Sequence, residues 1–120
     1  MGIRVLHCDD SEAFTRLVAF WLAEHDDIEY VGEARTAEAA LAALPTARPD
    51  VVLLDTLGDD TLLQAIRAAS PGVKVIVYSG YVRLMHEGAL GRSADGYLEK
   101  GDDEGPLLDA IRAVVKPKMS

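Results

Sequence analysis

Four consecutive apolar residues followed by an acid, Val51-Val52-Leu53-Leu54 and then Asp55, constrain the fold more than any other stretch of the sequence. A strand that is apolar on both faces is expected at the centre of a parallel sheet, where helices cover both sides. A second expected strand, Ile3–Cys8, also runs directly into acids, Asp9 and Asp10. Because parallel strands end at one edge of the sheet, and ligands bind at that edge, the three carboxylates predict a functional site there.

The rest of the chain alternates short apolar runs with helical periodicity, which is typical of repeated strand-helix units. Further strands are expected at residues 28–34, 73–78 and 96–99. We expect five helices. The first begins after Ser11, and the second begins after Thr36 and stops at Pro45. The third and fourth cover residues 61–69 and 81–93, and the fifth begins at Gly105-Pro106. The pattern therefore predicts an α/β protein with five parallel strands and five helices.

Two of these helices carry more specific predictions. The first helix is expected to bury one apolar stripe, made of Phe14, Leu17, Val18, Trp21 and Leu22. The helix at 81–93 should be the weakest, because it contains Gly88 and Gly91 and each glycine costs a helix about 1 kcal/mol.

Composition limits the classes of partner. With 120 residues and no linker or low-complexity tract, the chain is expected to form one domain, residues 1–120. Its net charge of −8 opposes direct binding to nucleic acid or to an anionic membrane surface. One cysteine, Cys8, no export signal and no membrane-spanning apolar run favour a reducing, cytoplasmic location.

The ends of the predicted strands carry a set of chemically related side chains. They are Asp9 and Asp10, then Asp55, Ser79 and Lys100, whereas the second strand ends on no obvious functional residue. Clustered carboxylates are stable only beside a cation, and an all-oxygen site suits Mg²⁺. A metal ion in such a site attracts a phosphoryl donor, and a lysine on its far side supplies positive charge to the oxygens of the phosphoryl group.

Other candidate ligands do not form a second metal site by their spacing. His7 and Cys8 are neighbours on a strand and so face opposite ways, and neither His25 nor His86 completes a zinc pattern. We interpret these four residues as structural or surface residues. Phe14 and Trp21 are expected in the core, and Tyr97 is either a core aromatic or part of a switch.

Four motifs at strand ends, in order along the chain, resemble the receiver domain of bacterial two-component response regulators. They are Val5-Leu6-His7-Cys8-Asp9-Asp10, Pro49-Asp50-Val51-Val52-Leu53-Leu54-Asp55, Val75-Ile76-Val77-Tyr78-Ser79-Gly80 and Ala94-Asp95-Gly96-Tyr97-Leu98-Glu99-Lys100. Further stretches, such as Val31-Gly32-Glu33-Ala34, are similar to NarL/LuxR-type receivers in particular. The resemblance implies a flavodoxin-like, doubly wound sheet with strand order 2-1-3-4-5.

The resemblance also implies a phosphoryl-transfer site. Asp55 would accept a phosphoryl group from a sensor histidine kinase or a phosphotransfer protein. Asp10 and Asp55 would bind Mg²⁺ directly, Asp9 would bind it through water, and the backbone carbonyl of Leu57 would complete the protein ligands. Lys100 would hold the phosphoryl group.

By the same resemblance, phosphorylation would change a partner-binding face. Ser79 would move to the phosphoryl group and Tyr97 would follow inward, which biases an element that already has two positions. The output would be a downstream protein partner, a phosphorylation-dependent homodimer, or a fused DNA-binding effector that is absent from this chain. Such a module catalyses only its own phosphoryl transfer and dephosphorylation and is not an enzyme for an external substrate.

Departures from the family pattern leave alternatives open. The loop Thr56-Leu57-Gly58-Asp59-Asp60 is several residues shorter than in most receivers, and Gly101 stands where proline is frequent. One alternative is therefore a degenerate receiver that acts as a phosphorylation-independent protein-interaction module. A small Mg²⁺-dependent phosphatase is a third reading, but Leu57 occupies the place where that chemistry needs a second acid.

Overall fold

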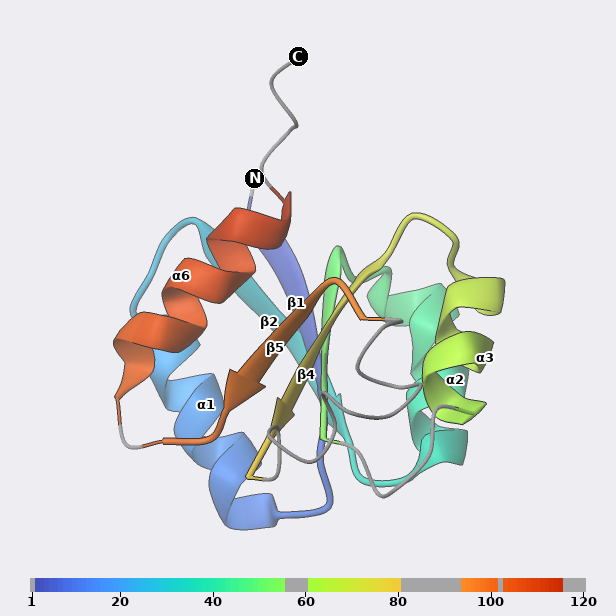
Figure 1. The fold of residues 1–120 in the computed structure, drawn as a ribbon, viewed down its shortest axis with the longest axis horizontal. Helices are drawn as coiled ribbons and strands as arrows, with labels where there is room; N and C mark the ends of the chain where they lie inside the picture. Colours follow the sequence, from blue (N-terminus) through green and yellow to red (C-terminus); the bar gives the residue numbers. More distant parts are fainter. Residues whose placement is uncertain (1, 56–60, 81–93, 102, 116–120) are drawn as a thin grey trace.

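A single parallel sheet forms the centre of the molecule (Figure 1). The computed structural model describes residues 2–55, 61–80, 94–101 and 103–115. Its strands are β1 (Ile3–Cys8), β2 (Ile28–Ala34), β3 (Val51–Leu54), β4 (Lys74–Ser79) and β5 (Gly96–Glu99). They pair in the order β2-β1-β3-β4-β5, all parallel, which confirms the predicted flavodoxin-like topology.

Helices cover both faces of this sheet. They are α1 (Glu12–Ala23), α2 (Ala37–Ala47), α3 (Thr61–Ala69) and α6 (Glu104–Val115). In Figure 1, α1 and α6 lie on one face of the sheet and α2 and α3 lie on the other. The helix expected at 81–93 falls outside the described residues. No helix within the described ranges has the length and apolar character needed to cross a membrane.

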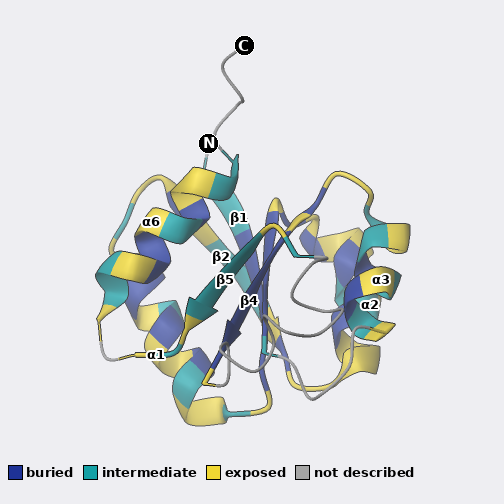
Figure 2. Cartoon of the chain, in the orientation of Figure 1, coloured by how far each residue is buried: buried dark blue, intermediate teal, exposed yellow. Residues whose placement is uncertain are grey.

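The sheet separates two apolar cores, and its central strands are buried (Figure 2). On β3, Val51 and Leu53 belong to the core beneath α1 and α6, whereas Val52 and Leu54 belong to the core beneath α2 and α3. All four side chains are at most 2% exposed. This alternation, with both faces covered, is the physical reason for the continuous apolar run.

Both predicted helix caps are present. The Ser11 hydroxyl accepts a hydrogen bond from the Phe14 N–H at 3.2 Å, and the Thr36 hydroxyl accepts one from the Ala39 N–H at 3.0 Å. Each cap satisfies a backbone donor that has no partner inside the helix. The helices that follow β1 and β2 therefore start where the sequence predicts.

The prediction that Pro45 stops the second helix is wrong, because α2 continues to Ala47. A proline in the last turn interrupts one hydrogen bond only, and the carbonyls beyond it find other donors. Arg48, in the left-handed conformation at φ 47°, donates its N–H to the Leu44 carbonyl at 2.9 Å. The Arg4 guanidinium donates to the Ala47 carbonyl at 2.8 Å and 3.0 Å.

The predicted apolar stripe of the first helix is wider than the observed one. Leu17 is 39% exposed, so its predicted burial is wrong, while Val18 and Leu22 are fully buried. The buried residues of α1 are Thr15, Val18, Trp21 and Leu22, and Leu17 lies beside them next to solvent. The last helix begins at Glu104, one residue before the predicted start, and Pro106 still lies in the first turn, where helical N–H groups have no partner.

Candidate functional site

The strand register brings the predicted site residues to one edge of the sheet. Asp55 follows β3 and donates its backbone N–H to the Cys8 carbonyl at 2.8 Å, so it lies beside Asp9. Lys100 follows β5 and donates its backbone N–H to the carbonyl of Ser79, the last residue of β4, at 3.0 Å. Residues far apart in sequence thus converge because parallel strands end together.

The Lys100 ammonium group lies between two carboxylates. Its Nζ is 2.7 Å from Oδ2 of Asp9 and 3.2 Å from Oδ2 of Asp55. The Asp9 side chain is fully buried, and the side chains of Asp55 and Lys100 are 13% and 23% exposed. Low exposure strengthens these interactions, because solvent screens them less than it would at the surface.

Three carboxylates form a cluster at this edge. One ligand oxygen from each of Asp9, Asp10 and Asp55 lies within 4.8 Å of the others. Asp10 is exposed and Asp9 is buried, so the cluster opens to solvent on the Asp10 side. Three converging oxygen donors with an open side match the preference of Mg²⁺, which binds few protein ligands and keeps several waters. The carbonyl of Leu57, the fourth predicted ligand, lies outside the described residues.

The two inner carboxylates have opposite pKa shifts. Burial alone would raise the pKa of Asp9, but the nearby His7 imidazole at 3.5 Å, the Lys100 ammonium group and the Ser11 N–H together outweigh burial and lower the pKa. Burial raises the pKa of Asp55, and the charge of Asp9 raises it further, against the opposing effects of Lys100 and Ser79. The positive charge of Lys100 therefore does not fully compensate for burial and for the charge of Asp9 at Asp55, and a bound cation would supply further positive charge there.

Lys100 remains a cation despite its partial burial. Burial lowers the pKa of its ammonium group, but the hydrogen bond and charge of Asp9 and the charge of Asp55 raise it above the ordinary value. A permanent positive charge at this position can neutralise an incoming anion as well as the carboxylates already present.

Ser79 and Tyr97, the two residues predicted to move on phosphorylation, differ in burial. Ser79 is fully buried at the end of β4, and its hydrogen bond with Asp55 opposes the rise in the pKa of that carboxyl group. Tyr97 lies on β5, packs against the core beneath α2 and α3, and its hydroxyl accepts a hydrogen bond from the Ala94 N–H at 3.4 Å. Ser79 thus lies within the site, while Tyr97 belongs to the adjacent core. Their movement stays a prediction.

Three rings border the site. Phe14 was expected in the core, His7 was interpreted as a structural or surface residue, and Tyr78 was given no role from the sequence. Lys100 Nζ lies 4.6 Å from the centroid of the Phe14 ring. His7 is fully buried, with Nε2 3.5 Å from Oδ2 of Asp9. Tyr78 packs against Phe14, and burial followed by the charge of Asp9 raises the pKa of Tyr78 to about 12. The strand period was an available signal for His7, because this residue of β1 lies two positions before Asp9, which directly follows the strand.

Arg35 is a further residue that the sequence did not single out. It follows β2 and lines a small cavity of about 20 Å³ together with Asp9, Asp10 and Asp55. This volume is enough for about one water-sized particle. The Arg35 guanidinium forms ion pairs with Oε2 of Glu33 at 3.4 Å and Oε2 of Glu12 at 3.5 Å.

Cys8 also lines this cavity, but it is not a nucleophile candidate. Burial, and then the charge of Asp9, raises the pKa of its thiol to about 12, so the thiolate is absent at neutral pH. This agrees with its interpretation as a structural residue.

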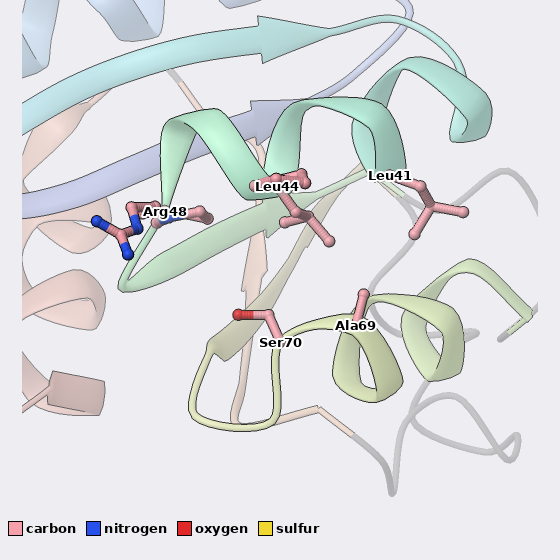
Figure 3. Close-up of a pocket in the computed structure, with 7 residues that line it drawn as sticks. Leu41, Leu44, Arg48, Ala69 and Ser70 are labelled. Carbon is pink, nitrogen blue, oxygen red and sulfur yellow. The ribbon is translucent and has the colours of Figure 1, made fainter.

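A larger cavity lies at the opposite edge of the sheet (Figure 3). It has a volume of about 450 Å³ between the ends of α2 and α3, and its lining includes Leu41, Leu44, Arg48, Ala69 and Ser70. This lining brings no acid or cluster of polar groups together. Among the described residues, the group of three acidic side chains placed closely enough to share a metal ion is Asp9, Asp10 and Asp55 at the carboxyl edge.

Comparison with known proteins identifies the family to which this fold belongs. The chain matches the family described as response regulator receiver domain over residues 5–112. Response regulator protein VraR of Staphylococcus aureus is 30% identical over 117 residues, which cover 93% of this chain and 56% of VraR. A protein-glutamate methylesterase/protein-glutamine glutaminase of Nocardioides is 33% identical over 130 residues, which cover 98% of this chain and 35% of that protein.

A solved structure agrees in fold. The signal receiver domain of the response regulator NarL from Mycobacterium tuberculosis superimposes with a TM-score of 0.80 at 27% identity, covering 93% of this chain and 94% of that one. The chain spans about half the length of the curated relatives that it matches first. The match says nothing about the parts of those relatives that it does not cover.

Proposed function

Because the chain belongs to the response regulator receiver domain family of two-component signalling proteins, we propose that Asp55 accepts a phosphoryl group from a sensor histidine kinase or a phosphotransfer protein. The observation that carries the proposal is the position of Lys100, whose ammonium group contacts both Asp9 and Asp55 beside three clustered carboxylates. Asp55 is the partly exposed member of the pair that contacts Lys100 and is therefore the one that a donor can reach.

In the proposed reaction, a carboxylate oxygen of Asp55 forms a bond to phosphorus while the bond between phosphorus and the donor breaks. The donor keeps the bonding electron pair, and a donor imidazole takes up a proton from solvent as it leaves. Lys100 neutralises the charge on the phosphoryl oxygens, and Ser79 is within the same site to donate a hydrogen bond. Asp9, Asp10, Asp55 and the Leu57 carbonyl would hold Mg²⁺, Asp9 through water, and the ion would supply further positive charge to the phosphoryl oxygens.

The added phosphoryl group would act as the signal. Ser79 and Tyr97 would change position together and so alter a partner-binding face near β5 and α6. The partner would be a downstream protein, a second phosphorylated copy, or an effector domain outside this sequence. We assign residues 1–120 to one receiver domain that acts in the cytoplasm and modifies no external substrate.

The test is the intact mass of the protein after incubation with acetyl phosphate. Wild-type protein should gain one phosphoryl group with Mg²⁺ and none with a chelator, and Asp55→Asn should gain none. Asp26→Asn removes an exposed aspartate outside the site and should behave as wild type. A folded wild-type protein that gains nothing would contradict the proposal and favour the phosphorylation-independent module.

A further inference from the structure

His7 is a buried polar residue at a position that packing alone would fill with an aliphatic side chain. It is 0% exposed on β1, and its neighbour on the same face, Val5, is also fully buried. Neither ring nitrogen makes a hydrogen bond of good geometry to any described residue. Polar atoms buried in this way are unfavourable unless they have a partner in some state of the protein.

The imidazole is directed at the acidic cluster. Its Nε2 lies 3.5 Å from Oδ2 of Asp9, at the long limit of a hydrogen bond, and both side chains are 0% exposed. Two aromatic rings enclose it: the Phe14 centroid is 5.9 Å away at an interplanar angle of 72°, and the Tyr78 centroid is 6.2 Å away at 34°. Among the described residues, Asp9 is the acid within ion-pair distance of the His7 ring.

Asp9 depends on few partners, and they belong to different parts of the site. Its Oδ1 accepts a hydrogen bond from the Ser11 N–H at 2.9 Å. Its Oδ2 faces Lys100 Nζ at 2.7 Å and His7 Nε2 at 3.5 Å. Ser11 and His7 are held by the chain on either side of Asp9, whereas Lys100 comes from the end of β5 and also contacts Asp55 at 3.2 Å.

We propose that His7 is a positioning residue for Asp9: its Nε2–H donates to Oδ2 and keeps the carboxylate oriented when Lys100 turns to the phosphoryl group. This inference rests on the proposed function for the movement of Lys100, whereas the orientation of Asp9 toward a cation is needed in the unphosphorylated protein as well. The Nε2–Oδ2 separation then shortens to an ordinary hydrogen bond. The orientation of Asp9 toward the cation is thereby maintained through the reaction.

Two variants of His7 separate the effect of its ring N–H from the effect of the size of its side chain. His7→Gln places an amide N–H at about the reach of Nε2, whereas His7→Leu keeps an apolar group of similar size. Val5→Ala, on the same strand and face, perturbs packing without contacting Asp9 and serves as the control. Mg²⁺ affinity is measured by titration calorimetry on each unphosphorylated, folded protein, and the lifetime of the phosphoryl group after acetyl phosphate treatment is measured with Mg²⁺.

We expect His7→Leu to bind Mg²⁺ about 10-fold more weakly, the lower end of the range for groups that orient a metal ligand, and to change the phosphoryl lifetime. His7→Gln should restore both to within about 2-fold of wild type, since it retains the donor. Val5→Ala should lose stability with unchanged Mg²⁺ affinity. Equal affinity in His7→Leu and wild type, or equal losses in His7→Leu and His7→Gln, would overturn the positioning role.

A measurement on the wild-type protein covers the case in which His7→Leu does not fold. Proton-nitrogen NMR of the histidine rings should show an Nε2–H of His7 that is protected from exchange and that shifts when Mg²⁺ is added or Asp9 is changed to Asn. A rapidly exchanging or unresponsive signal would refute the inference. These readouts do not require phosphorylation, so a wild-type protein that takes no phosphoryl group would contradict the proposed function separately.

Discussion

The ammonium group of Lys100 lies over the ring of Phe14, with Nζ 4.6 Å from the ring centroid. This contact joins the end of β5 to the first turn of α1. It places the ring against the cation that also contacts both inner carboxylates, and a cation over an aromatic face is stabilised by about 0.5–2 kcal/mol depending on exposure. Phe14 therefore supports the position of Lys100 in addition to filling the core.

Replacement of Phe14 by leucine should lower the free energy of unfolding by about 1–2 kcal/mol, because the contacts with Lys100 and with the Tyr78 ring at 5.2 Å are both lost. Urea denaturation with a chelator present measures this change. Phe20→Leu is the matched control on the same helix, since Phe20 is 64% exposed, and it should change stability by less than about 0.5 kcal/mol. Equal effects of the two variants would contradict the role assigned to the ring.

Removal of the charge of Asp55 should stabilise the metal-free protein at neutral pH. Burial and the charge of Asp9 raise the pKa of Asp55 above its ordinary value of 3.8, so the folded protein binds this proton more tightly than the unfolded chain does. The stability that Asp55 contributes is present below about pH 3.8 and is lost as the pH rises through the folded pKa. Asp55→Asn does not ionise and avoids this loss.

The measurement is urea denaturation of wild type and Asp55→Asn in a chelator at about pH 3 and about pH 7. The variant should have the higher midpoint at neutral pH, and the difference should shrink at acid pH. Comparing the two proteins is necessary because the pKa of Asp9 is lowered, so its effect on stability has the opposite dependence on pH. A lower midpoint for Asp55→Asn at neutral pH would disprove this explanation.

Removal of the Lys100 charge should have the opposite effect on the metal-free protein. Lys100→Met leaves the fully buried Asp9 carboxylate without its ion pair to Lys100. We expect the free energy of unfolding to fall by roughly 2–3 kcal/mol, which is less than for a fully buried pair because Lys100 is 23% exposed. Added Mg²⁺ should recover part of the loss by neutralising the same carboxylates. Lys74→Met, at the exposed start of β4, is the control, and its free energy of unfolding should stay within about 0.5 kcal/mol of the wild-type value. A loss in Lys74→Met as large as that in Lys100→Met would argue against a specific role for the ion pair.

Asp10 should matter for the metal and little for folding. It is the exposed member of the carboxylate cluster, so Asp10→Asn removes a candidate Mg²⁺ ligand without opening the core. We expect Mg²⁺ affinity to fall by about 10-fold or more and urea stability in a chelator to change by less than about 0.5 kcal/mol. Titration calorimetry checks the affinity, with Asp26→Asn as a control for the loss of one negative charge. Unchanged affinity in Asp10→Asn would remove Asp10 from the ligand set.

Local sequence features determined the sheet and most of the site. The period of a strand explains the apolar run at residues 51–54, and the unpaired N–H groups at a helix start explain the caps Ser11 and Thr36. The shared edge of parallel strands explains why the polar residues at strand ends meet. Such rules place Asp9, Asp55, Ser79 and Lys100 together before any side-chain packing is known.

Long-range packing decided the remainder. The exposure of Leu17 depends on how closely α1 contacts the sheet, and the continuation of α2 past Pro45 depends on Arg4, more than forty residues earlier in the chain. The roles of Phe14 and His7 follow from where Lys100 and Asp9 lie in space. The sequence alone determined which chemical groups this protein brings to the carboxyl edge. The tertiary structure decided which neighbours hold each group, because those contacts join segments that no local pattern relates.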